Sequence, residues 1–109
     1  MSLKVILEEF GMPSVREVRR ATDEYAEIVF YNEKLGEIDA VLRGMLGTPR
    51  KPAGLEPSSD DLNLTREYGG IWLNQTLFVG AYEGCEVMAM YWPWEDEVHT
   101  TLKMAYLKR

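Results

Sequence analysis

The chain has one cysteine and one histidine among its 109 residues. A single cysteine excludes an internal disulfide, and we interpret Cys85 as a small strand residue in a reducing compartment. A lone histidine gives no paired-ligand spacing, so we predict no metal site and no cofactor. No apolar run approaches the roughly 20 residues that a transmembrane helix needs, and no basic region precedes an apolar stretch as in a signal peptide. We therefore expect a cytoplasmic protein.

Positive charge is also scarce. Lysine and arginine number 12 against 18 aspartate and glutamate residues, and the net charge is −6. Phosphate binding requires a basic surface, so we expect no nucleic-acid partner, and an anionic membrane would repel the chain. Apolar residues make up 46%, which is typical of a globular protein and too many for a disordered one. The length predicts a single domain, residues 1–109.

The N-terminal segment, residues 1–22, has helical patterns. Apolar residues recur at helical spacing over residues 3–10, and a Gly-Met-Pro sequence then interrupts the pattern. Ser14 and Glu17 have the spacing of a capping box, which predicts a second helix. A helix-turn-helix motif is an alternative interpretation. The acidic residues of the segment balance its arginines, however, whereas a DNA reader needs net positive charge.

A strand and a long helix are predicted next. Residues 25–31 are rich in β-branched and aromatic side chains, which favours a strand, although a helix continuing from Asp23 is the alternative. Residues 33–46 carry a helical apolar stripe. Gly47 occupies the position of a left-handed residue after that helix, and Pro49 prevents its continuation.

The C-terminal half begins with a long connection, residues 47–70, that contains several prolines and glycines. Within it, Ser58 opens a sequence suited to capping a short helical turn. Three antiparallel strands follow, over residues 76–82, 85–92 and 98–107, and Glu83-Gly84 forms the first turn between them. Both faces of these strands are apolar, so we expect helices to cover one face and a loop or a partner to cover the other.

The predicted fold class is therefore α+β. N-terminal helices pack on an antiparallel sheet of about four strands, in the element order α-α-β-α-β-β-β. From Tyr25 onward the order is strand, helix and three strands, and Leu46-Gly47-Thr48-Pro49 ends the helix. This part resembles one βαβββ module of the vicinal-oxygen-chelate, or glyoxalase-like, superfamily. The metal-ligand pattern of that superfamily is missing here, because the only histidine lies on the last predicted strand.

The most informative motif is Trp92-Pro93-Trp94, which acidic residues follow between two predicted strands. Indole rings give much contact area at low entropic cost, and proline fixes where they point. Trp92, Trp94, Asp96 and His99 are thus candidate contacts for a ligand or partner. The alternative is that the indoles complete the core. On an extended strand Glu97 and His99 would share a face and could form a proton-transfer pair.

Two further candidate sites lie outside this turn. Asn74 and Gln75 follow a glycine pair, and their amides could bind a polar ligand. Arg50 and Lys51 lie on the stiff connection, and with Arg66 they are candidates for binding an anion.

No motif identifies a reaction, and catalysis is not predicted. A short chain with apolar strands and a tryptophan-rich turn has more apolar surface than its helices cover. We therefore interpret it as an acidic binding or protein-interaction module that forms a homo-oligomer, most simply a dimer. The alternative is a small-molecule sensor or small enzyme, with its cleft between the long connection and the sheet.

Overall fold

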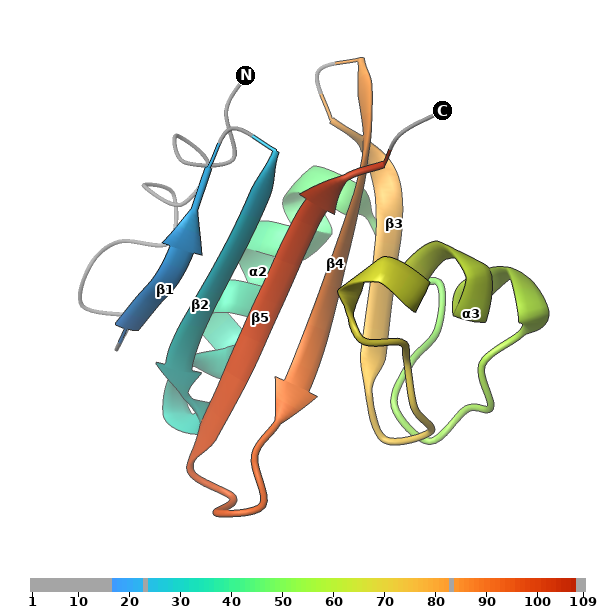
Figure 1. Ribbon diagram of the computed structural model, residues 1–109. Helices are drawn as coiled ribbons and strands as arrows, with labels where there is room; N and C mark the ends of the chain where they lie inside the picture. Colours follow the sequence, from blue (N-terminus) through green and yellow to red (C-terminus); the bar gives the residue numbers. More distant parts are fainter. Residues whose placement is uncertain (1–16, 23, 83, 108–109) are drawn as a thin grey trace.

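The computed structural model describes residues 17–22, 24–82 and 84–107. A five-stranded antiparallel sheet in the order β1-β2-β5-β4-β3 forms its centre (Figure 1). The strands are β1 (Glu17–Ala21), β2 (Tyr25–Tyr31), β3 (Thr76–Tyr82), β4 (Cys85–Pro93) and β5 (His99–Tyr106). The helices are α2 (Leu35–Leu46) and α3 (Ser59–Thr65), with 3₁₀ turns η3 (Asn32–Lys34) and η4 (Arg66–Tyr68). In Figure 1, α2 lies behind the sheet and α3 lies in front of it, near β3 and β4.

The α+β class and the antiparallel sheet are confirmed, but the predicted order is wrong. The described elements run β-β-α-α-β-β-β, and the sheet has five strands rather than about four. Residues 17–21, predicted as part of a helix, form edge strand β1, which also contradicts the second helix of the helix-turn-helix alternative. The helix predicted over residues 3–10 lies outside the described residues.

Pairing with β2 explains why β1 is a strand despite its helical pattern. Glu17 pairs with Val29 and Val18 with Ile28, and a bulge follows Val18. The Thr22 hydroxyl accepts hydrogen bonds from the backbone N–H groups of Glu24 and Tyr25, which closes a hairpin turn. Main-chain pairing thus outweighs the local capping pattern.

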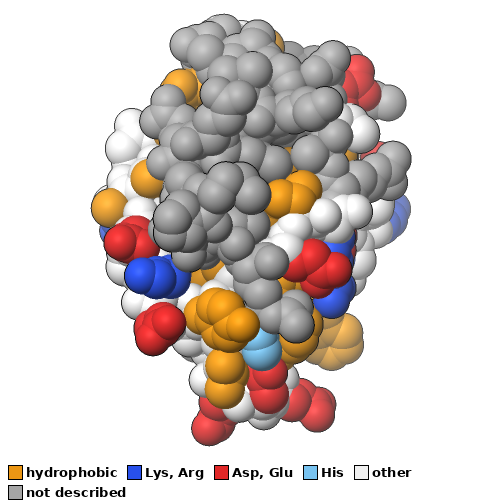
Figure 2. All heavy atoms as spheres, turned by 90° about the vertical axis from the view of Figure 1, so that its left-hand side faces the viewer, with side chains coloured by type: hydrophobic (Ala, Val, Ile, Leu, Met, Phe, Trp, Pro, Cys, Tyr) orange, Lys and Arg blue, Asp and Glu red, His pale blue; other side chains and the backbone are white. Residues whose placement is uncertain are grey.

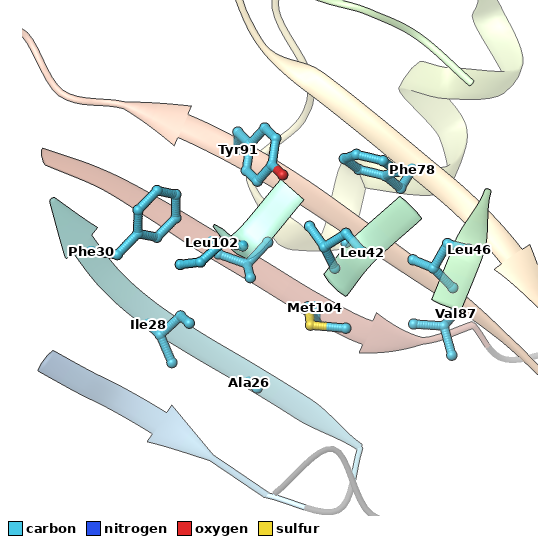
Figure 3. Close-up of a cluster of buried hydrophobic side chains, with 12 residues drawn as sticks. Ala26, Ile28, Phe30, Leu42, Leu46, Phe78, Val87, Tyr91, Leu102 and Met104 are labelled. Carbon is cyan, nitrogen blue, oxygen red and sulfur yellow. The ribbon is translucent and has the colours of Figure 1, made fainter. Parts of the chain in front are cut away.

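The main core lies between the sheet and α2 (Figure 3). Alternate residues of the strands point toward the helix, and Ile38, Leu42 and Leu46 of α2 meet them. The residues labelled in Figure 3 as part of this cluster include Ala26, Ile28, Phe30, Phe78, Val87, Tyr91, Leu102 and Met104. The helix approaches β3 so closely that a Cβ at Gly80 would lie 2.7 Å from the Leu46 carbonyl oxygen.

A second apolar cluster covers part of the opposite face, which we call the distal face. Ile71, Leu77, Met88, Met90 and Ala105 are its buried members. Tyr68 and Trp92 pack against it, together with Tyr25, Val79 and Leu107. A segment that follows α3 therefore covers this part of the sheet, in agreement with the prediction that a loop covers one face.

The long connection is ordered by specific contacts. Lys51 forms an isolated bridge to Leu77 at the outer edge of β3. Ser58 and Asp61 form a complete capping box, which confirms the predicted helical turn and extends it into α3. Gly47 has a positive φ of 83°, as predicted, but its ψ of −161° places it outside the left-handed helical region. In the described part of the chain, no helix has the length and apolar character that crossing a membrane requires.

Candidate functional site

The tryptophan motif ends β4 and opens the turn to β5. Trp94 donates its backbone N–H to the His99 carbonyl oxygen at 2.9 Å, and the Glu97 N–H reaches the Trp94 carbonyl oxygen at 3.3 Å. Glu97 has a φ of 59°, which is unusual for a residue other than glycine. The predicted hairpin is therefore present, and Trp92 and Trp94 are both half-buried at its base.

His99 is held by three side chains at this turn. Its ring lies between Tyr31, with centroids 4.9 Å apart, and Trp94, with centroids 4.7 Å apart. Its Nδ1 lies 2.5 Å from an Asp96 carboxylate oxygen. The expected partner was Glu97, but the turn geometry removes that residue from the strand, and Asp96 takes its place. A carboxylate partner makes Nδ1 the donor and orients the ring.

Asp96 is the acceptor at the centre of the turn. The hydrogen bond from His99 lowers the pKa of Asp96 to about 2, and the backbone N–H of Val98 adds to this effect. The Asp96 carboxylate also accepts the His99 N–H at 3.0 Å. In Figure 2, hydrophobic side chains gather around the histidine, with acidic side chains beside it. The turn is thus a rigid aromatic and acidic surface.

Trp92 lies deeper on the distal face. The Lys103 ammonium is 3.6 Å from its ring centroid, which is a cation–π contact. Gly69 lies so close to the indole that a Cβ there would be 2.8 Å from the ring. The indole Nε1 is buried without a hydrogen-bond partner among the described residues. Trp92 therefore contributes to the second cluster, as in the alternative that the indoles complete the core.

A hollow of about 490 Å³ lies beside these rings on the distal face, and we call it the distal hollow. Its lining comprises Arg19, Tyr25, Glu27, Glu67, Tyr68 and Lys103. These residues come from β1, β2 and β5 and from η4, at the end of the long connection. The strand register places Glu27 directly opposite Lys103, so both project from the same face of the sheet.

Hydrogen bonds and ring contacts order the lining. The Tyr25 hydroxyl donates to Glu27 at 2.7 Å, and the rings of Tyr25 and Tyr68 are nearly parallel with centroids 5.8 Å apart. Lys103 donates to the Tyr68 carbonyl oxygen at 3.2 Å. Burial lowers the pKa of Lys103, and the charge of Glu27 partly counters this. Burial, followed by the charge of Glu67, raises the pKa of Tyr68.

Arg19 connects the distal hollow to the tryptophan turn. Its guanidinium carbon lies 5.3 Å from the Trp94 ring centroid, and a guanidinium nitrogen lies 3.9 Å from Glu27. Trp94 in turn donates its indole N–H to the Thr101 hydroxyl at 2.8 Å. The structure thus brings Trp92, Trp94 and the Asp96–His99 pair to one face, next to the hollow.

The other predicted site residues lie elsewhere. Asn74 is exposed, whereas Gln75 is buried and accepts the Trp72 N–H at 2.9 Å. Arg50 forms an ion pair with Asp61 at 2.8 Å.

Lys51 and Arg66 are also engaged. Lys51 is fully buried and donates to three backbone carbonyl oxygens. Burial lowers its pKa, which nearby carboxylates partly counter. Arg66 donates to Asn63 at 2.8 Å and lines a separate hollow of about 310 Å³. These contacts do not unite the three predicted anion-binding residues.

Sequence reasoning missed the lining of the distal hollow. Alternation offered a signal for part of it, because Glu27 and Lys103 are charged residues with apolar neighbours on both sides in the sequence. Arg19 was assigned to a helix, and Tyr68 comes from an irregular segment whose position no pattern indicates.

A smaller hollow of about 360 Å³ opens beside α2. Tyr91 donates to Asp39 at 2.8 Å, and Arg43 holds the same carboxylate at 2.6 Å. Burial and the Asp39 hydrogen bond raise the pKa of Tyr91, so its hydroxyl stays protonated and acts as a donor. We interpret this group as a structural tie between α2 and β4.

Comparisons with known proteins provide no family for this chain. No family model, curated protein or solved structure matches it. The likeness to a glyoxalase-like module therefore remains a resemblance in element order. Among the described residues, no group of three or more His, Cys, Asp or Glu side chains is placed to hold a metal ion.

Proposed function

We propose that this protein is a binding module that holds a small polar ligand in the distal hollow. The observation that carries the proposal is the convergence of four charged side chains and two tyrosines on a hollow of about 490 Å³. Small-molecule sites typically have volumes of about 300–1,000 Å³ and combine aromatic walls with a few polar groups.

This proposal develops the sensor interpretation of the sequence. The hollow lies where the end of the long connection, at Glu67 and Tyr68, meets the sheet. Its cations are Arg19 and Lys103 rather than the residues predicted for anion binding. We infer binding rather than catalysis, because aromatic rings surround His99 and Cys85 lies at the opposite end of β4 from the turn.

A ligand screen by NMR tests the proposal. Small polar metabolites are added to ¹⁵N-labelled protein, and amide shifts are followed. We expect a binder to shift signals of residues 25–27, 67–69 and 102–104, and to raise the melting temperature because it binds the native state. Tyr68→Ala should remove both effects. Lys34→Met is the control, since Lys34 lies in η3 outside the hollow lining.

Two results would contradict the proposal. One is a screen in which no compound shifts the signals of the hollow. The other is a binder whose shifts all lie elsewhere and persist in Tyr68→Ala.

Self-association is a second candidate function, and a different observation favours it. Trp72 has 64% of its surface exposed, and Leu55 and Leu73 are exposed beside it. The backbone bond from Gly54 to Leu73, at 2.7 Å, joins the two loops that carry this patch. Exposed apolar patches rich in aromatic residues mark protein contacts. We propose that a second copy of the chain covers it in a homodimer.

Sedimentation velocity across a concentration series tests this second candidate. Trp72→Ala should shift the protein toward monomer, whereas Trp94→Ala should leave the assembly unchanged. A wild-type protein that stays monomeric at high concentration would rule out the dimer. It would not affect the proposal for the distal hollow.

A further inference from the structure

The cationic and acidic side chains that line the distal hollow are equal in number, but not all of them form ion pairs. Glu27 accepts the Tyr25 hydroxyl at 2.7 Å and lies 3.9 Å from Arg19. Arg19 also lies 3.5 Å from Glu17. These groups therefore compensate one another within the described structure.

Lys103 is the cation without a contact ion pair, although the charge of Glu27 acts on it from the neighbouring strand. It is half-buried on β5, the central strand, and its contacts are the Tyr68 carbonyl oxygen and the Trp92 ring. Among the described residues, no carboxylate lies within 4.0 Å of its ammonium. A partly desolvated cation with no carboxylate in contact favours an anion beside it.

Glu67 is an acidic residue of the same lining and comes from η4 rather than from the sheet. It is exposed, lies in η4 next to Tyr68, and has no ion pair with a described residue. A ligand cation near it would gain a charge-assisted contact. The rings of Tyr25 and Tyr68 lie in the same lining, where they offer apolar contact to a side chain.

This pattern disfavours ligands of a single charge. The carboxylates of Glu27 and Glu67 would repel a simple anion, and Arg19 and Lys103 would repel a simple cation. A ligand with both charges meets a complementary group at each end.

We infer that the distal hollow binds a small zwitterion of the α-amino acid class with an apolar or aromatic side chain, its carboxylate toward Lys103 and its ammonium toward Glu67. This inference rests on the proposed function and specifies its ligand. The side chain of the ligand lies against the tyrosine rings.

Calorimetric titration with matched ligands tests the inference. L-phenylalanine, L-tryptophan, L-leucine and L-methionine are each compared with their N-acetyl derivative, which lacks the ammonium, and with their amide, which lacks the carboxylate. At least one free amino acid should bind, and removal of either of its charges should weaken binding by about tenfold or more. ¹⁵N shifts locate the binding.

Two variants test which side chain of the hollow contacts each charged group of the ligand. Lys103→Met should weaken binding of the free amino acid by about tenfold or more, whereas its amide, which Lys103 repels, should bind no more weakly than to the wild type. Glu67→Gln should weaken binding of the free amino acid, whereas its N-acetyl derivative, which Glu67 repels, should bind no more weakly than to the wild type. Lys34→Met and Glu33→Gln, in η3, are the charge-matched controls. Circular dichroism verifies folding, and Lys103→Gln replaces Lys103→Met if the latter does not fold.

The outcomes separate this inference from the proposed function. If an N-acetyl derivative or an amide binds in the hollow as tightly as the free amino acid, the zwitterion inference is wrong and the binding function stands. The same holds if only ligands of other chemistry bind there. If neither these ligands nor the metabolite screen affects the hollow, both are wrong.

Discussion

Replacement of Lys51 by methionine should destabilise the protein substantially. The lysine is fully buried, and its ammonium donates to the carbonyl oxygens of Pro52 at 3.2 Å, Leu73 at 3.1 Å and Gln75 at 2.5 Å. Its backbone also exchanges two hydrogen bonds with Leu77. The side chain therefore ties the long connection to the turn before β3, and methionine keeps its length without its donors.

The expected loss of stability depends on which hydrogen bonds each of the three carbonyl oxygens keeps in the variant. The Leu73 oxygen keeps the Gly54 N–H at 2.7 Å, and the Pro52 oxygen keeps the Leu55 N–H at 3.3 Å. The Gln75 oxygen has no other donor among the described residues. Without the lysine it becomes an unsatisfied buried acceptor, which costs about 1–3 kcal/mol. Loss of the charged hydrogen bonds adds to this, whereas removal of a buried ammonium offsets part of it. We expect a net loss of about 2–4 kcal/mol, a large share of a typical stability of about 5–15 kcal/mol.

Urea unfolding followed by tryptophan fluorescence measures this loss. Lys34→Met is the control for removing a lysine charge and should change stability by less than about 0.5 kcal/mol. Hydrogen exchange at the Leu77 amide, which bonds to the Lys51 carbonyl oxygen at 2.9 Å, should accelerate in Lys51→Met. A variant as stable as the wild type, with unchanged exchange at this amide, would refute the argument that the ammonium holds the connection.

Four further predictions concern single side chains, and equilibrium unfolding tests each. Gly80→Ala should lose about 1–3 kcal/mol, because its Cβ would lie 2.7 Å from the α2 backbone. Gly44→Ala, in open space on α2, should instead gain about 0.5–1 kcal/mol. A Gly80→Ala variant that is more stable than Gly44→Ala would contradict the packing of α2 on β3. The pKa of Asp96 is lowered from 3.8 to about 2, so wild-type stability should fall as the pH drops from about 4 through about 2, and Asp96→Asn should flatten this slope. Tyr91→Phe should lose about 1–2 kcal/mol with its hydrogen bond to an α2 carboxylate. Because the pKa of Tyr91 is raised in the fold, wild-type stability should also fall above about pH 10, and less steeply in the variant. Lys103→Met should be as stable as the wild type or up to about 1 kcal/mol more stable. A clear loss of stability would indicate that Lys103 has a structural role.

The parts of the fold that sequence reasoning predicted are those with strong local patterns. Helix α2 has a continuous apolar stripe that ends at Gly47, and the strands from β3 to β5 alternate between two apolar faces. Strand β1 is only five residues long, and its position depends on pairing with β2, which no local pattern shows. The capping sequence of Ser14 and Glu17 therefore pointed to a helix.

Sequence reasoning likewise predicted one part of the candidate site and missed another. Trp94, Asp96 and His99 are close in the sequence, so the predicted hairpin placed them at one turn, although strand alternation paired His99 with Glu97 rather than with Asp96. Glu27 and Lys103 are far apart along the chain, and only the register of β2 and β5 places them opposite each other. The burial of Lys51 was equally hidden, because proline-rich sequence around a cation is typical of an exposed loop, whereas here the connection folds back onto β3.

The placement of Lys103 is the strongest reason to regard the distal face as functional. β5 is the central strand of the sheet, and on the α2 face it contributes Leu102 and Met104 to the hydrophobic core. On its distal side this strand carries a lysine whose burial opposes its charge, in a position flanked by Met90 and Glu27 on the neighbouring strands. Methionine would extend the apolar cluster and avoid the desolvation cost of the ammonium. We therefore expect a lysine at this position to cost stability in the unliganded protein, which the stability of Lys103→Met tests, and a bound carboxylate would offset that cost.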